Sequence, residues 1–253
     1  PQQAQRQQPR KTIYDAMEQL AAFYQNQLRQ HPQAQRAIDY LKQRGLSGQI
    51  ARDFGIGFAP PGWDNVLKSF GSNDESRQQL LDAGMLVEKE DSDKVYDRFR
   101  DRIIFPIQDV RGRVIAFGGR AMQADARAKY MNSPETPLFH KSSVLFNFAR
   151  ARQAAYDTKS VLVAEGYMDV IAIQRSGTAA AVAPLGTALT EEQIALLWKL
   201  HDEPILCFDG DAAGQRAQMR ALERILPLLT PGKSARLAVM PKGKDPDDVL
   251  RET

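Results

Sequence analysis

Apolar residues recur every three or four positions through the first part of the chain, and this spacing predicts helices. In residues 12–28 the apolar positions are Ile13, Tyr14, Met17, Leu20, Ala21, Tyr24 and Leu28, with Thr12 placed as a cap. Similar spacing predicts helices at 33–44, 47–54, 64–70 and 76–83. Gly45 and Gly84 follow two of them as stop signals. We therefore expect the chain up to about residue 93 to be mostly helical.

Two β-rich runs follow, at 102–108 and 113–118, joined through a turn that contains Gly112. This pattern predicts an antiparallel hairpin, in which Pro106 suits an edge strand. Regular periodicity then stops until Val144, which predicts a long functional or mobile loop. The run VLFNF alternates like a strand, so we expect Phe146 and Phe148 in the core.

From residue 160 the pattern changes to strands that alternate with helices. We expect strands at 161–166, 179–186, 205–211 and 235–241, and helices at 167–177, 190–200, 212–229 and from 245 onward. Apolar strands separated by helices predict parallel βαβ units. The predicted fold class is therefore α/β, or α+β overall: a mixed helical and β N-terminal subdomain with a hairpin sheet, then a doubly wound parallel layer.

These patterns divide the chain into three parts. Residues 1–11 are rich in Gln and lack an apolar pattern, so we interpret them as a linker remnant. Residues 12–158 form the N-terminal subdomain and residues 159–253 the α/β subdomain. The first residue is Pro, not Met, which indicates a piece of a longer protein or a processed chain.

Composition narrows the class of protein. The chain has 43% apolar and 26% charged residues, with no apolar run near the roughly 20 residues that a membrane span needs and no secretory signal. We expect a cytoplasmic protein without a membrane contact. The one cysteine, Cys207, allows no internal disulfide and is expected as a small buried hydrophobe. No Cys/His spacing indicates zinc.

Charge is distributed unevenly along the chain. Residues 94–152 hold twelve Lys and Arg against five Asp and Glu, whereas residues 161–253 hold ten against thirteen. This layout is expected if one surface follows phosphates and another holds cations, although dispersed surface charge gives the same totals.

Three of the four predicted parallel strands end in carboxylates: Glu165 after the first, Asp209 and Asp211 after the third, and Asp245, Asp247 and Asp248 after the fourth. Ligands gather at the carboxyl ends of such strands, so we expect these acids on one edge. The ordinary alternatives are a polar strand end for Glu165, a turn for the DGD and a helix cap for Asp245; Asp169, four residues after Glu165, would be a first-turn acid. Together they would repel one another strongly without cations, which predicts Mg²⁺ or Mn²⁺, two or more ions in all.

The stretches EGYMD, FDGDAAG and GKDPDD resemble the Toprim domain of topoisomerases and primases. RIIFPIQDVRGRVIAFGGR and KYMNSPETPLFHK resemble bacterial replicative primases of the DnaG type, and the likeness covers nearly the whole chain after its Gln-rich start. It implies a DNA-dependent RNA polymerase that makes short primers on single-stranded DNA from ribonucleoside triphosphates. It assigns Glu165, Asp209 and Asp211 as catalytic acids that also bind metal, with Asp169, Asp245 and Asp247 as further ligands. Glu165 is also a candidate base, and the sequence does not separate the two roles.

The same resemblance implies that Arg52, Arg120, Lys129, Asn132 and Lys141 contact template or nucleotide phosphates. Taken from the residues alone, these side chains also fit solvated surface charge. Aromatic residues such as Tyr130 and Phe139 interleave with this basic segment, where rings can stack on bases or pack in the core.

Such primases also have an N-terminal zinc module and a C-terminal module that docks the replicative helicase. We expect neither in this sequence, which we interpret as the catalytic core alone. Two other functions stay open. One is Toprim-type strand cleavage, which in a topoisomerase needs a tyrosine nucleophile, with Tyr167 more consistent with helix packing. The other is a non-catalytic module that binds single-stranded DNA in a replication complex.

Overall fold

The computed structural model of the protein describes residues 2–89, 92–186 and 188–252. Its contacts divide the chain into two compact units. Unit 1 comprises Pro1–Ile107 and Arg113–Phe139, and unit 2 comprises Gln108–Gly112 and His140–Thr253. Each unit has its own cluster of buried apolar side chains.

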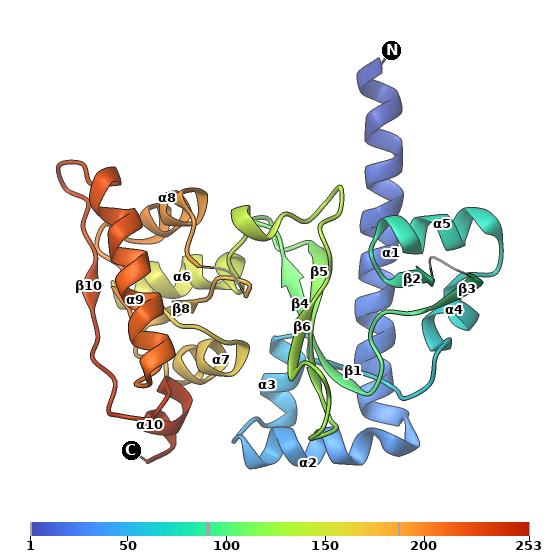
Figure 1. Ribbon diagram of the computed structural model, residues 1–253, viewed down its shortest axis with the longest axis horizontal. Helices are drawn as coiled ribbons and strands as arrows, with labels where there is room; N and C mark the ends of the chain where they lie inside the picture. Colours follow the sequence, from blue (N-terminus) through green and yellow to red (C-terminus); the bar gives the residue numbers. More distant parts are fainter. Residues whose placement is uncertain (1, 90–91, 187, 253) are drawn as a thin grey trace. The chain divides into compact units, whose positions relative to one another are not determined.

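Unit 1 is built on a four-stranded sheet in the order β1-β4-β5-β6. The long helix α1 packs against β1 and β5, as Figure 1 shows for α1 and β1. Side chains of α1 such as Met17 and Leu20 are fully buried with Phe117 of β5 in this core. The sheet strands are β1 (Gly57–Ala59), β4 (Arg102–Gln108), β5 (Val114–Ala121) and β6 (Tyr130–Asn132).

The helix α1 (Gln2–Gln30) begins ten residues earlier than the sequence pattern predicts. The start expected at Thr12 is therefore wrong, and the backbone of residues 2–11, interpreted as a linker, is helical. Gln, Arg and Lys are good helix formers even without an apolar stripe, which explains the continuation. Pro1 lies outside the described residues.

Short helices fill the rest of unit 1 close to their predicted positions. Ser47 caps α3 by accepting from the Ile50 N–H, and Asn73 forms a reciprocal cap with Ser76 at the start of α5. These helices are η1 (Pro32–Ala34), α2 (Gln35–Gln43), α3 (Gly48–Asp53), α4 (Asn65–Phe70) and α5 (Asp74–Asp82). Two further strands, which the mostly helical prediction missed, pair antiparallel: β2 (Leu86–Lys89) and β3 (Ser92–Asp97).

The predicted hairpin strands form as β4 and β5, but the edge position expected for Pro106 is wrong. Strand β4 lies between β1 and β5. Because β1 is short and pairs only with Arg102, Ile103 and Ile104, Pro106 lies beyond the end of β1 and needs no N–H for that pairing.

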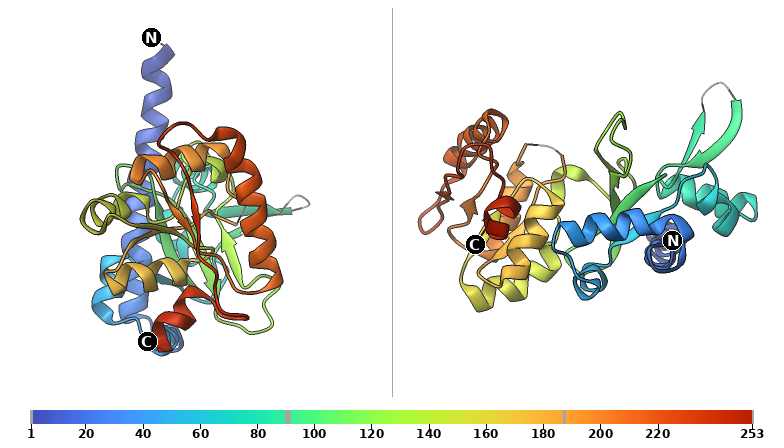
Figure 2. Two further views of the ribbon diagram at one scale, coloured as in Figure 1. Left: turned by 90° about the vertical axis from the view of Figure 1, so that its left-hand side faces the viewer. Right: turned by 90° about the horizontal axis from the view of Figure 1, so that it is seen from below.

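Unit 2 contains a four-stranded parallel sheet in the order β10-β9-β7-β8. Helix α6 contacts α8, and helix α7 contacts α10. Figure 1 shows these two pairs on opposite sides of the strands. Figure 2 shows α10 beside α7 in both views. The doubly wound α/β prediction is confirmed. The elements are η2 (Lys141–Ser143), α6 (Phe148–Thr158), β7 (Val161–Val163), α7 (Tyr167–Ser176), β8 (Ala180–Val182), α8 (Glu191–Leu200), β9 (Ile205–Leu206), α9 (Ala212–Ile225), η3 (Leu226–Leu228), β10 (Arg236–Leu237) and α10 (Pro246–Glu252).

The main segment of unit 2 begins at His140, earlier than the predicted subdomain boundary at 158/159. The reason is α6, whose Phe148, Ala151 and Ala155 are buried in the unit 2 core. Phe146 forms only an isolated bridge with Ala183, so the strand pattern there is wrong, while the burial of Phe146 and Phe148 is confirmed. The functional division at 158/159 stays a prediction.

The last strand, β10, is much shorter than the apolar run 235–241 suggests. It contains only two residues at the edge of the sheet, and Val239 beyond it is 89% exposed.

In the described ranges, none of the helices combines the length and apolar character needed to cross a bilayer.

Candidate functional site

Glu165 and Asp209 meet at the carboxyl-end edge of the unit 2 sheet. The strands β7 and β9 are parallel neighbours, with Val163 beside Leu206, so the loops that follow them leave the sheet together. The backbone N–H of Asp209 donates to Glu165 Oε1 at 3.0 Å. The structure thus brings these two predicted acids into contact.

Gly210 joins the loop after β9 to the loop that precedes α10. Its N–H donates to the Lys244 carbonyl at 2.9 Å, and the Gly243 N–H donates to the Gly210 carbonyl at 3.1 Å. A Cβ at position 210 would lie 2.0 Å from a carbonyl oxygen of the facing loop, so only glycine permits this approach. These bonds place Asp245 close to Asp209.

Asp211 is the N-cap of α9. Its Oδ1 accepts from the N–H groups of Ala213 at 2.8 Å and Gly214 at 2.7 Å. The sequence analysis gave a turn as the ordinary alternative here, and the structure shows a helix cap, which uses one carboxylate oxygen of Asp211. Gly214 packs on the backbone of Asp209, where a Cβ would lie 2.2 Å from the Asp209 carbonyl oxygen.

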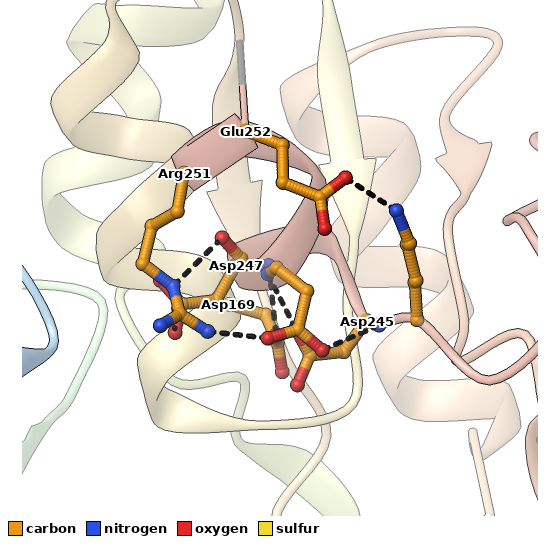
Figure 3. A network of polar contacts seen from close by, with 7 residues as sticks. Asp169, Asp245, Asp247, Arg251 and Glu252 are labelled. Carbon is orange, nitrogen blue, oxygen red and sulfur yellow. Dashed lines mark hydrogen bonds and ion pairs between the residues drawn. The ribbon is translucent and has the colours of Figure 1, made fainter.

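Asp169 reaches the same edge from the first turn of α7, where it is buried. Its Oδ1 accepts from the Asp247 N–H at 3.3 Å. Asp245 caps α10 by accepting from the Asp248 N–H at 2.7 Å, with Pro246 in the first turn, as the ordinary alternative predicted. Figure 3 shows Asp169, Asp245 and Asp247 gathered at the start of α10.

Arg251 provides a positive charge on the same helix. Its Nε lies 3.5 Å from Asp247 Oδ2, and its guanidinium also pairs with Asp248 (Figure 3). Asp247 is 1% exposed, and Arg251 already provides a cation beside it. The geometry supports Asp247 as a ligand less than it supports Asp209.

The crowding of acids shifts their titration. Burial, followed by the charges of Asp245 and Asp209, raises the pKa of Asp169 to about 7. Burial, followed by the charges of Glu165 and Asp245, raises the pKa of Asp209 to about 6. A bound divalent cation would favour the ionised forms and reverse these shifts.

The Asp209 carboxylate has a buried oxygen that is suited to a cation. Asp209 Oδ1 has no hydrogen-bond partner among the residues that the structure describes. Within the same residues, no three or more His, Cys, Asp or Glu side chains form a ready metal cage. Mg²⁺ does not require one, since it commonly takes one or two carboxylates and completes its shell with waters and phosphates. The donors at this edge fit such an ion.

Cys207 lies just before these acids and is buried. Burial, together with the nearby charges of Asp169 and Asp209, raises the pKa of its thiol to about 11. The expected small buried hydrophobe is confirmed.

The η2 turn that carries Lys141 is tied to the start of α8. The buried Gln193 amide donates to the carbonyls of Lys141 at 2.9 Å and Val144 at 2.8 Å, while Oε1 accepts from the Thr190 N–H at 3.1 Å. The Thr190 hydroxyl donates to the Ser142 carbonyl. Because α8 follows β8, these bonds hold Lys141 on the carboxyl-end side of the sheet.

Three of the predicted phosphate contacts lie together in unit 1. Arg120 of β5 pairs in register with Tyr130 of β6, and Asn132 lies two residues further on the same face. Lys129 immediately precedes β6, with its ammonium 6.0 Å from the Tyr130 ring centre. The Arg120 guanidinium lies 3.7 Å from the ring centre of Tyr40.

Arg44, which the sequence analysis did not single out, lies 5.9 Å from the same Tyr40 ring. Arg52 is on a different element, α3, where it donates to Gln49 at 2.7 Å. There it lines a mainly apolar pocket of about 200 Å³ between α1, α2 and α3. The predicted basic residues are therefore not one cluster, and Lys141 belongs to unit 2.

A second pocket in unit 1, of about 380 Å³, was missed by the sequence analysis. Its wall includes Trp63, which is 63% exposed, and the guanidinium of Arg100 lies 4.2 Å from the Trp63 ring centre. Arg98 and Arg102 also line it. We call this the Trp63 pocket.

Among the described residues, three arginines and one acid, Asp101, line the Trp63 pocket, and Asp101 is paired with Arg36 at 2.7 Å. Burial lowers the pKa of Arg102, and the neighbouring charge of Arg100 lowers it further. Burial also lowers the pKa of Arg98. The signal in the sequence was the spacing of arginines at 98, 100 and 102. The structure places them around the bend between β3 and β4, where Asp101 has a φ of 49°.

The edge of the unit 2 sheet that carries Glu165, Asp169, Asp209 and Asp245 is called the acidic edge. We expect replacement of Gly214 by alanine to disrupt it. The new methyl group collides with the Asp209 backbone, so the free energy of unfolding should fall by about 1–3 kcal/mol. Urea unfolding of the variant measures this loss. Gly232→Ala is the control for glycine replacement in the same unit, because a Cβ there meets no atom within 4 Å, although its positive φ adds some strain. Equal stability of Gly214→Ala and wild type would contradict the packing described.

The raised pKa values also predict how stability depends on pH. Asp169 and Asp209 keep protons to about pH 7 and 6 when folded, above their usual pKa of 3.8, so the metal-free folded state binds more protons than the unfolded chain. The free energy of unfolding, measured in EDTA to keep the protein free of metal, should therefore fall as pH rises from about 4 to 7. Thermal unfolding across this range measures the decline, which Asp169→Asn should reduce. An identical pH profile in the variant would rule out this cause.

Comparison of the sequence with known proteins identifies related proteins for both units. The DNA primase catalytic core, N-terminal domain, matches residues 23–152, and the Toprim domain matches residues 159–237. The DNA primase of Pseudomonas aeruginosa is 52% identical over 94% of this chain and 36% of the relative, and that of Escherichia coli K12 is 50% identical over 100% and 43%. The chain thus spans less than half the length of these relatives.

Solved structures show the same relationship. A DNA primase domain from Pseudomonas aeruginosa has a TM-score of 0.91 at 52% identity, covering 95% of this chain and 74% of that one. The DnaG primase catalytic domain bound to ssDNA has a TM-score of 0.88 at 49% identity, covering 97% and 76%. With its two halves matched in this order, the chain belongs to the family of DNA primase catalytic cores that carry a Toprim domain.

Proposed function

We propose that this chain joins ribonucleotides into short RNA primers on a single-stranded DNA template. The observation that carries the proposal is the convergence of Glu165, Asp209 and Asp245 on one sheet edge, with Asp209 Oδ1 buried and lacking a hydrogen-bond partner among the described residues. Primases about 50% identical to the chain support the reaction.

In this proposal Glu165, Asp209 and Asp211 hold the divalent ions, with Asp169, Asp245 and Asp247 as further ligands. Mg²⁺ or Mn²⁺, two or more ions in all, would offset the charge that builds on the phosphate oxygens. Glu165 Oε1 accepts the Asp209 N–H, so this bond fixes the side chain whether Glu165 acts as ligand or base. Asp211 keeps its second oxygen available while the first caps α9.

The protein groups have separate tasks around the reacting phosphate. Asp209 is oriented by the backbone contacts of Gly210 and Gly214, so its carboxylate needs little rearrangement. Lys141, held by Gln193, supplies a positive charge for the triphosphate of an incoming nucleotide. The 3′-hydroxyl would attack the α-phosphate of the incoming nucleotide, the bond from that phosphate to pyrophosphate would break, and pyrophosphate would leave. The hydroxyl proton would pass to a base at this edge, for which Glu165 is the candidate.

Unit 1 would hold the template. The exposed ring of Trp63 with Arg100 against it is a platform on which an unpaired base can stack, and Arg98 and Arg102 can neutralise phosphates beside it. Arg120, Lys129 and Asn132, on one part of the same unit, would contact further phosphates, and Arg52 remains a more distant candidate. A 49% identical catalytic domain has been solved bound to ssDNA, which supports this assignment.

The alternative of Toprim-type strand cleavage would share the acidic residues, and in a topoisomerase it would also need a tyrosine nucleophile, for which Tyr167 is poorly placed. That side chain is 7% exposed and packs edge-on against Phe146, with ring centres 4.6 Å apart. A nucleophile must reach a phosphate, which this packing prevents. A non-catalytic DNA-binding module would use the Trp63 pocket equally well. A measurement of primer synthesis therefore decides between a primase and such a module. The helicase contact and the cytoplasmic location stay predictions.

Replacing Asp209 by Asn should abolish primer synthesis while leaving the fold intact. The substitution keeps the shape but removes the charge that holds the ion, so the rate should fall about 100-fold or more. Incorporation of labelled ribonucleotides on a single-stranded template with Mg²⁺ measures it. Glu223→Gln, which removes an exposed carboxylate from α9, is the matched control and should keep the wild-type rate. A wild-type rate in Asp209→Asn would refute the metal role.

Single-strand binding should separate stacking from charge in the Trp63 pocket. Trp63→Ala removes a stacking surface, so affinity should fall about five- to 150-fold with an unchanged salt slope. Arg100→Ala should lower the slope of log affinity against log salt by about 0.7. Fluorescence anisotropy of a labelled oligothymidine at several NaCl concentrations measures both.

The control for this experiment is Tyr156→Ala. Tyr156 is 71% exposed and has the Lys159 ammonium 3.9 Å from its ring centre, so it resembles the Trp63 pair but lies in unit 2 outside the pocket. It should bind DNA like wild type. Equal losses in Tyr156→Ala and Trp63→Ala would show that the pocket has no special role.

A further inference from the structure

Asp97, the last residue of β3, is a carboxylate that is only 1% exposed. Taking such a group out of water is costly unless hydrogen bonds replace the lost hydration. Burial accordingly raises its pKa, and backbone N–H groups at the start of α4 lower it in part. A buried acid that does not belong to the acidic edge of unit 2 calls for an explanation of its own.

The side chain of Asp97 caps α4 from another part of the chain. Its Oδ2 accepts from the Val66 N–H at 2.8 Å and its Oδ1 from the Leu67 N–H at 3.0 Å. The residue in the cap position of α4, Asp64, makes no side-chain cap bond. Asp97 therefore does for α4 what a local cap does for other helices, and it fixes the segment that immediately follows Trp63.

The backbone of Asp97 holds both members of the stacked pair. Its N–H donates to the Trp63 carbonyl at 2.7 Å, and its carbonyl accepts from Arg100 Nη1. Trp63 and Arg100 face each other at 4.2 Å, and Tyr96 meets the Trp63 ring edge-on at 5.4 Å between ring centres. One residue thus connects the helix start, the tryptophan and the arginine.

We propose that Asp97 is a positioning residue that holds Trp63 and Arg100 in the geometry needed to stack a base of single-stranded nucleic acid. The proposal rests on the proposed function of the Trp63 pocket. A rigid platform binds more tightly because less conformational freedom is lost on binding, so loosening the segment should weaken binding although Asp97 touches no ligand.

The chain has two tryptophans, which makes the test direct. Trp198 lies in unit 2, where it donates to the Ser234 carbonyl, so Trp198→Phe leaves Trp63 as the one fluorescent indole without altering unit 1. In this background, Asp97→Asn keeps the size of the side chain but directs an amide donor at one of two N–H groups. We expect a lower fluorescence anisotropy of Trp63 and a roughly three- to tenfold weaker affinity for oligothymidine.

Asp64→Asn is the matched control. Asp64 is a carboxylate beside the same helix start, paired with Lys68 at 3.0 Å, but it makes no cap bond. It should leave both the anisotropy and the affinity unchanged. Asp97→Asn should also cause no additional loss of affinity once Trp63 is alanine, because a residue that acts through Trp63 has nothing left to position.

The outcomes separate the two hypotheses. If Trp63→Ala itself binds normally, the proposed function of the pocket fails. If Trp63→Ala is weak but Asp97→Asn matches wild type in anisotropy and affinity, the positioning role alone is overturned. Asp97→Ser, which retains one acceptor, should give intermediate values and serves where Asp97→Asn does not fold. Failure of both variants to fold would identify Asp97 as a global stability residue and overturn the proposal.

Discussion

Mutual repulsion among carboxylates is the constraint on which the candidate active edge depends. Glu165, Asp209 and Asp245 come from three loops and Asp169 from the first turn of α7, and nothing in their own charges favours their meeting. Backbone hydrogen bonds hold them together instead, with Gly210 joining two loops and the start of α10 meeting Asp169. The fold thus keeps an electrostatically unfavourable arrangement that a divalent ion can relieve, and proton uptake substitutes for the ion when none is bound.

Unit 1 also brings like charges together, but there the charges are positive. Arg98, Arg100 and Arg102 line one pocket, and Arg100 lies against an aromatic ring. Arginine tolerates such surroundings because its guanidinium is weakly hydrated and stacks on rings. The pocket therefore presents positive charge and an aromatic surface together, as an unpaired nucleotide requires.

The sequence predicted those features that depend on local pattern. The order of strands and helices after residue 160 followed from apolar runs, and the place of each carboxylate followed from the strand it ends. The strand β1 could not be found this way, because it forms where Gly57 lets the backbone approach Tyr24 and pair with distant β4. Similarly, Trp63 and Arg100 are far apart in the sequence, and only β3 and the capped start of α4 bring them together. The resemblance assigned phosphate contacts to both Arg52 and Arg120 without saying how they lie, and the structure gives them different neighbours on α3 and β5.

Cys207 has a practical consequence. As the one cysteine of the chain, buried and with a pKa near 11, it will react very slowly with maleimides or nitroxide reagents at neutral pH. A cysteine engineered at an exposed position would then be labelled selectively in the otherwise native sequence. Spin or dye labels could therefore report on either unit without first removing a residue that packs beside the acidic edge.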